Sequence, residues 1–303
     1  MATKDTSPVN QGEGRGMSTT RRMFHMAWRM RGFQVGLGVF LLMVLAAIIL
    51  PEITEISATK ISVRERFLPP FFLEGGTLKH LAGTDQLGRD LLLRSLIGLR
   101  NALAIGVASV VVMFILGCGL GIVSGYWGRW IDTILMRFTD AQLSVPLIVL
   151  AITILGVTRP NAGTVIAVLV LSGWPIYARV VRSVTLSERQ REYVRGAKIL
   201  GASDLRIMLI MIEPNILPPF AFVAVLDVAR MMIFEALFGF IGIGIQPPTP
   251  TFGNIISDGT KYIINYWWIP TMPGLCLIIM LLSINVMGSG LERSRNKIFA
   301  GVS

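Results

Sequence analysis

Long apolar runs separated by short polar segments dominate this chain of 303 residues. Each of the main runs approaches the roughly 20 residues that a helix needs to cross a bilayer. They predict spans over residues 32–50, 101–125, 141–157, 162–181, 216–245 and 269–291. We therefore expect an all-α integral membrane protein with six transmembrane helices. Pro146 is expected to kink the third span and Pro175 to break the fourth.

Composition agrees with a membrane protein, because 53% of the residues are hydrophobic and only 15% are charged. The net charge of +10 could favour nucleic acid in a soluble domain, but here we assign it to loops on one side of a membrane. Cys118 and Cys276 lie inside apolar runs without metal-ligand spacing, so they are interpreted as small core residues.

The distribution of basic residues predicts the orientation. Residues 1–31 hold six basic and two acidic residues, whereas residues 51–98 hold six of each. Because basic loops stay in the cytoplasm, we expect cytoplasmic tails over 1–31 and 292–303. The same rule places residues 51–98 outside the membrane as a loop with an amphipathic helix. It leaves five helices in residues 99–291, with a cytoplasmic loop over 182–213.

A polar segment from Arg189 to Pro219 separates two of the spans. Its pattern predicts a helix, a break at Gly201, a second helix capped by Ser203, and a stop at the prolines. Helical spacing places Tyr193, Ala197 and Leu200 on one side. Such a segment either lies on its own bundle or docks onto a partner, and periodicity leaves both open.

Charges inside the fifth span are the second candidate site. Asp227 and Arg230 lie on one helix face and are expected to pair, while Glu235 has no local partner. Intramembrane charges are costly and face the bundle or a wet cavity. They therefore either hold subunits together through polar contacts or line a translocation path.

Two features concern the first half of the chain. Asp85, Arg89 and Asp90 are expected to pair within a turn, with Asp90 starting an amphipathic helix that enters the second span. Glycines repeat every four residues at Gly117, Gly121 and Gly125, a spacing that lets another helix approach closely.

Three strings of residues carry a family resemblance. "GTDQLGRD" before the second span, "YVRGAKILGASDLRI" in the polar segment and "GIGIQPPTP" after the fifth span are similar to the ABC importer permeases. The match is with the dipeptide/oligopeptide and nickel group, in its second-permease branch. The chain departs from that pattern at Gly196, Glu213 and Ser289.

The resemblance implies the type I importer permease fold and an ATPase-coupling loop. The residues implied in that loop are Arg195, Gly196, Ala197, Gly201, Ala202, Asp204 and Pro214. Implied partners are a homologous second permease, two ATPase subunits, an extracytoplasmic solute-binding protein and the lipid of the inner membrane. No nucleic acid is expected.

The sequence has no phosphate-binding G-x-x-x-x-G-K-[ST] motif and only two histidines. We therefore expect no catalytic residues, no metal site and no bound cofactor, with ATP and Mg²⁺ used by the partner ATPases. The implied solutes are di- and oligopeptides. Alternatives are nickel, oligosaccharides or peptide-like compounds, an ion-coupled secondary transporter, and a channel or structural membrane protein.

Overall fold

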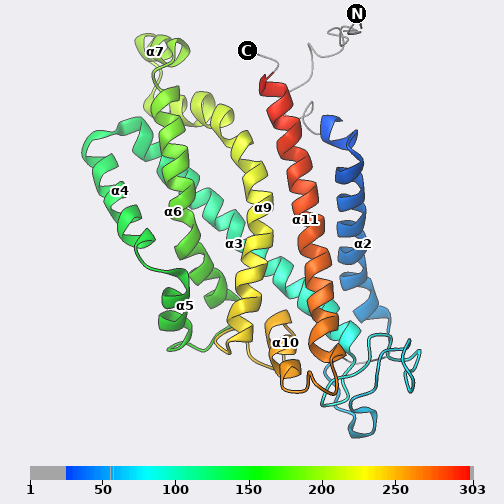
Figure 1. Cartoon of the computed structure of the whole chain (residues 1–303). Helices are drawn as coiled ribbons and strands as arrows, with labels where there is room; N and C mark the ends of the chain where they lie inside the picture. Colours follow the sequence, from blue (N-terminus) through cyan, green and yellow to red (C-terminus); the bar gives the residue numbers. More distant parts are fainter. Residues whose placement is uncertain (1–24, 55, 57, 301–303) are drawn as a thin grey trace, which may run out of the picture.

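The computed structural model describes residues 25–54, 56 and 58–300 and is helical in its regular parts (Figure 1). Most of the tail predicted over residues 1–31 lies outside the described residues. Within the described residues, four helices are long and apolar enough to cross a membrane singly. They are α2 (Arg31–Ile53), α3 (Leu91–Trp127), α6 (Ala162–Glu188) and α11 (Trp268–Ala300).

Two bent pairs bring the number of spans to as many as six. Helices α4 (Arg129–Leu143) and α5 (Leu147–Leu155) meet at 82°. The other pair is Asp204–Pro218 and Phe220–Phe240, bent by 57°, so its break lies within helix α9 (Glu213–Phe240). The remaining elements are short: η1 (Val63–Glu65), α7 (Glu192–Ile199), α8 (Asp204–Arg206), η2 (Ile207–Ile212) and α10 (Phe252–Thr260). The expected all-helical membrane fold is confirmed.

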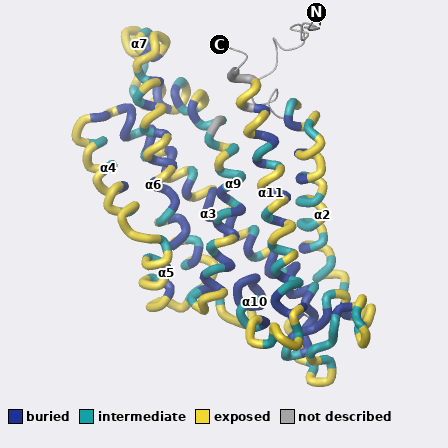
Figure 2. The backbone as a smooth tube through the Cα atoms, in the orientation of Figure 1, coloured by how far each residue is buried: buried dark blue, intermediate teal, exposed yellow. Residues whose placement is uncertain are grey.

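Helix α3 runs obliquely through the bundle and packs against α2, α6, α9 and α11 (Figure 1). Its most extensive partner is α6. Buried positions face these internal contacts, while the outward sides of α2 and α4 are exposed along much of their length (Figure 2). The exposed positions include Leu42 of α2 and Phe138 of α4. Large apolar side chains with this exposure are suited to lipid.

The repeated glycines bring α3 and α6 into close contact, as the sequence predicted. A Cβ atom on Gly117 would lie 2.5 Å from Cβ of Tyr177, and one on Gly125 would lie 2.6 Å from Cβ of Thr185. At Gly121 it would lie 2.6 Å from the carbonyl oxygen of Ala178. Such distances leave no room for a side chain, so the two helices pack backbone against backbone.

The prolines follow their predicted roles only in part. Pro146 lies at the break between α4 and α5, where the pair bends by 82°, so the helix is interrupted at the predicted kink. Helix α6 continues through Pro175, because burial of Gly173, Trp174 and Pro175 offsets the one backbone hydrogen bond that proline removes. Pro214 occupies the first turn of α9, where proline is tolerated, so the prolines bend this region without ending it.

Helix ends also differ from the predicted spans. The amphipathic helix and the second span form one helix of 37 residues, α3. Helix α9 ends at Phe240, five residues before the predicted end at 245. Helix α11 continues to Ala300, so most of the tail predicted over 292–303 is helical. In α3 and α11, polar residues flank the apolar run, so the apolar pattern ends before the helix does. The backbone continues its helical hydrogen bonding through these polar residues.

A buried polar cluster stabilises the loop before α3. Asp90 caps the helix by accepting from the backbone N–H of Leu93 at 2.8 Å, and its other oxygen lies 2.8 Å from Nδ1 of His80. Arg89 donates from Nε to Asp85 at 2.7 Å. The Asp85–Arg89 pair was predicted, but Asp90 binds His80 instead of joining it. The sequence offered no signal for this contact across ten residues.

Candidate functional site

The first candidate site is the segment of residues 189–215, which we call the coupling segment. It lies at the same end of the bundle as the first described turn of α2 and the last turn of α11, and α7 is its outermost part (Figure 1). The loop before α3 and helix α10 lie at the opposite end (Figure 1). The coupling segment is therefore placed to contact a molecule beyond the bundle.

A glycine-terminated cap defines the direction of α7. Gly201 has φ +82°, in the left-handed region that favours glycine. Its N–H donates to the carbonyl of Lys198 at 3.1 Å, and the N–H of Ala202 donates to that of Ala197 at 3.0 Å. This pair of bonds is the Schellman motif. Ser203 then caps α8, so the predicted break and restart are both present.

Apolar side chains divide the coupling segment into an inner and an outer side. Val194 and Ala197 are buried, whereas Ile199 and Leu200 are 87% and 88% exposed. The expectation that Ala197 and Leu200 share one side is wrong, because α7 ends at Ile199 and the following turn redirects Leu200. Two adjacent, almost fully exposed aliphatic residues form a surface suited to a protein partner.

Hydrogen bonds connect the coupling segment to the end of α3. Arg189 donates from Nη1 to the carbonyls of Gly125 and Tyr126 at 2.9 and 3.0 Å. The hydroxyl of Tyr126 donates to Asp204 at 2.6 Å. The two bonds from Arg189 occupy backbone carbonyls that the end of α3 leaves without intrahelical donors. These contacts attach the coupling segment to the end of α3.

A second group of bonds fixes α7 to α6 and α9. The hydroxyl of Tyr193 donates to Glu188 at 2.8 Å and accepts from the amide of Asn215 at 3.3 Å. Burial raises the pKa of Tyr193, and the hydrogen bond to Glu188 raises this pKa further. The phenol therefore keeps its proton at neutral pH and remains a donor. Arg191 also pairs with Glu188, at 2.9 Å.

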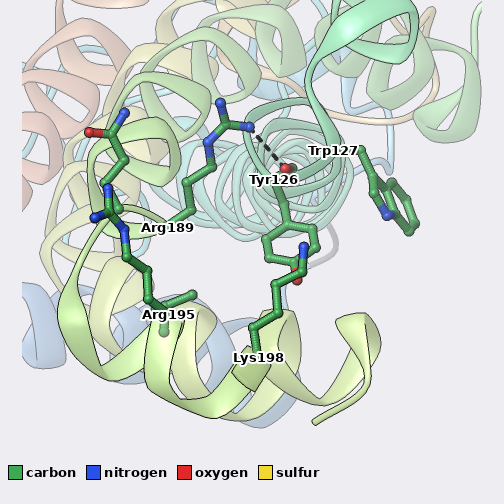
Figure 3. A pocket seen from close by; sticks show the side chains of 7 residues that line it. Tyr126, Trp127, Arg189, Arg195 and Lys198 are labelled. Carbon is green, nitrogen blue, oxygen red and sulfur yellow. Dashed lines mark hydrogen bonds between the residues drawn. The ribbon is translucent and has the colours of Figure 1, made fainter. Parts of the chain in front are cut away.

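Between the coupling segment and the end of α3 lies a cavity of about 460 Å³, which we call the basic cavity (Figure 3). Arg189, Arg195 and Lys198 surround it together with Tyr126 and Trp127 (Figure 3). Its other lining residues are Gln190 and Val194, so none of the described acidic residues contributes to the wall.

Two arginines near the end of α6 attach α4 to the bundle. Arg182 donates to both carboxylate oxygens of Asp132, and Arg179 donates to Asp140 at 2.6 Å. Asp140 thus pairs with a residue of α6 and not with Arg137, which lies three residues before it on α4. Charges that could have faced lipid phosphates thus serve contacts between helices.

The predicted pair within α9 is present. Nη2 of Arg230 lies 2.9 Å from Asp227, and Asp227 also accepts from the hydroxyl of Tyr177 in α6 at 2.5 Å. Glu235 is only 2% exposed, and its Oε2 has no hydrogen-bond partner among the described residues. Among the described residues, no three His, Cys, Asp or Glu gather to hold a metal ion.

Residues 117–296, more than half of the chain, match the family of binding-protein-dependent transport system inner membrane components. The chain belongs to this permease family. It is 37% identical over 264 residues to the di/tripeptide transport system permease protein DppC of Pseudomonas aeruginosa, covering 86% of each chain. To the dipeptide transport system permease protein DppC of Escherichia coli it is 35% identical, covering 91% of this chain and 92% of that one.

A solved structure shows the same fold. The membrane chain of the inward-facing MetNI methionine ABC transporter is similar, with a TM-score of 0.52 and 21% identity. The match covers 65% of this chain and 94% of that chain. The family match and the curated relatives make the chain a non-catalytic, multi-pass inner-membrane permease of an ABC transporter, as the resemblance implied. Family membership also sets aside the ion-coupled carrier and the channel.

The permease places its predicted coupling residues in different environments. Gly201, Pro214 and Arg195 are exposed, and Arg195 lines the basic cavity. Gly196, Ala202 and Asp204 are half-buried, while Ala197 is buried and faces the permease itself. Tyr126, Arg189 and Ile199 were missed, because their importance depends on how α3 and α7 are oriented. Basic residues at Arg189, Arg195 and Lys198 were the one available signal.

Proposed function

We propose that this permease imports di- and oligopeptides through an ATP-driven transporter. The observation that carries the proposal is the similarity over about nine-tenths of the chain to permeases named for dipeptide transport. A homologous second permease, two ATPase subunits and an extracytoplasmic solute-binding protein complete the transporter. In this arrangement the permease supplies part of the path, and the ATPases supply the energy.

Both termini and the coupling segment face the cytoplasm in this proposal. The excess of basic residues in 1–31 and 179–213 supports this orientation. Residues 51–90 and α10 then face outward, where a solute-binding protein arrives. The placement of α7 at the same end as the last turn of α11 agrees with this arrangement (Figure 1).

Energy enters the permease through the exposed side of the coupling segment. Ile199 and Leu200 provide the apolar contact with an ATPase, and the Gly201 cap holds them in place. When ATP binding brings the two ATPases together, α7 moves with them. Arg189 and Tyr126 pass the motion to α3, and the close glycine packing makes α6 follow.

The polar residues of α9 divide between the two roles left open by the sequence. Asp227 holds α9 to α6 through Tyr177, which is a structural role within one permease. Arg230 is 42% exposed on its side chain and is available to the path or to the second permease. Glu235 is enclosed by its own bundle, so in this conformation it does not line an open path.

Tyr177→Phe is expected to weaken the attachment of α9 to α6. Hydrogen bonds between membrane helices contribute about 1 kcal/mol, so the free energy of unfolding should fall by about that amount. Denaturant titration of the detergent-solubilised permease measures the change. Tyr262→Phe is the matched control, because the Tyr262 hydroxyl has no hydrogen bond among the described residues. Equal losses in the two variants would contradict a specific role for the Tyr177–Asp227 bond.

Reconstitution tests the solute. The permease is assembled with its partner subunits in vesicles, and uptake of a dipeptide, a tripeptide, Ni²⁺ and an oligosaccharide is compared with and without ATP. We expect ATP-dependent accumulation of the peptides. Accumulation of Ni²⁺ or the oligosaccharide in place of peptides would refute the peptide assignment and leave the transporter class unchanged.

A further inference from the structure

Two cations of the basic cavity, Arg195 and Lys198, have no ion-pair partner among the described residues of the permease. Arg189 uses Nη1 for the backbone of α3, and it carries a full positive charge. Asp204 is bound to Tyr126 and is not part of the wall. An anion would therefore find three positive groups around one space.

Two exposed tryptophans lie at or beside the basic cavity. Trp127 forms part of the wall and is 41% exposed, and Trp130 just beyond it is 69% exposed. Tryptophan is enriched at the boundary between hydrocarbon and water. Below them on α4, Ile134 and Phe138 are 58% and 60% exposed, which gives acyl chains an apolar surface to lie against.

We propose that the basic cavity binds the phosphate of an anionic lipid headgroup. Arg195 and Lys198 attract the phosphate, Arg189 borders it from the α6 side, and the acyl chains extend along α4. Basic pockets between the ends of membrane helices are suited to anionic headgroups. The lipid would occupy the gap between α7 and α3, and so would stiffen the coupling segment. This inference holds whatever solute the permease carries.

An acidic side chain of a partner protein is the competing occupant. The apolar tip at Ile199 and Leu200 supplies the surface expected for a protein contact, and it is separate from the cavity wall. The cavity instead has the exposed Trp127 in its wall, and Trp130 and the exposed apolar residues of α4 follow Trp127 in the chain. Lipid therefore accounts for both the charge of the cavity and the character of its surroundings.

Native mass spectrometry of the full-length permease in detergent provides the test. Phosphatidylglycerol, phosphatidylcholine and glycerol 3-phosphate are titrated separately, so that lipid-attached phosphate is distinguished from free phosphate. We expect preferential binding of phosphatidylglycerol. Arg195→Gln with Lys198→Gln should lower its affinity about thirtyfold, equivalent to about 1 kcal/mol for each removed charge.

Two further variants keep the result interpretable. Arg206→Gln with Arg293→Gln removes two exposed charges outside the cavity wall and should leave the affinity close to that of the parent permease. Arg195→Lys with Lys198→Arg keeps both charges and should retain binding, even if the charge-removing variant is poorly folded.

Three outcomes would contradict the proposal. Equal losses of phosphatidylglycerol affinity in the two charge-removing variants would overturn the site, because they would show a general attraction of the lipid to basic surface residues. Equal binding of glycerol 3-phosphate would overturn the lipid assignment. Absence of any preference for phosphatidylglycerol in the permease alone, followed by crosslinking of Lys198 to an acidic partner residue in the complex, would assign the cavity to a protein instead.

Discussion

Gly201→Pro is expected to uncouple the permease from its ATPases. Proline fixes φ near −65°, whereas Gly201 has φ +82° and donates its N–H to Lys198. The substitution removes the turn that directs α7 and costs about 3 kcal/mol or more. Peptide uptake and peptide-stimulated ATP hydrolysis by the reconstituted transporter should therefore fall at least about tenfold. The amount of permease inserted in the membrane should not change.

Two milder substitutions make this a graded test. A Cβ atom at Gly201 or at Gly196 would meet nothing within 4 Å, so neither alanine variant introduces a clash. Gly201→Ala must still adopt positive φ, at a cost of about 1–2 kcal/mol, and should lose part of the coupling. Gly196→Ala should stabilise α7 by about 1 kcal/mol and preserve uptake. Full coupling in Gly201→Pro would refute the role assigned to the coupling segment.

Gly121→Leu should separate α3 from α6 and destabilise the whole bundle. Even a Cβ atom at this position would lie 2.6 Å from the carbonyl oxygen of Ala178 and 2.9 Å from Cβ of Val181. Backbone cannot move aside as a flexible side chain can, so we expect a loss of about 3 kcal/mol. The free energy of unfolding in detergent, from denaturant titration, measures the loss.

The same helix offers a matched control for this prediction. Gly119 lies two residues away, and a Cβ atom there would meet nothing within 4 Å. Gly119→Leu makes the same chemical change on the open side of α3, and it should shift stability by less than about 0.5 kcal/mol. Comparable losses at both positions would show that close packing of α3 on α6 is not the cause, because leucine favours a helix more than glycine does.

Local patterns predicted the parts of the structure that depend on neighbouring residues. Apolar runs identified the spans because crossing a bilayer constrains each segment by itself. The Gly201 cap, the Ser203 start and the Asp227–Arg230 pair also lie within one turn of their partners. Each could therefore be inferred from spacing along the chain.

Contacts between distant segments were outside the reach of such patterns. Arg179 pairs with Asp140, which is 39 residues away in the sequence. The rotation of α4 and α6 about their axes decides which charged side chains face each other. His80 binds Asp90 only when the outer loop folds back. The basic cavity likewise exists because α7 turns toward Tyr126, an orientation that no property of α7 alone determines.

The length of α3 has a further consequence. A helix of 37 residues measures about 55 Å, nearly twice the thickness of the hydrocarbon core. Tilting such a helix by about 5° displaces one end by about 5 Å relative to the other, which is close to one helical turn. Asp90 and Tyr126 stand at its two extremities. In the orientation proposed above, binding of a loaded solute-binding protein at the Asp90 end and nucleotide binding at the Tyr126 end would then influence each other with equal free energy, as thermodynamic reciprocity requires.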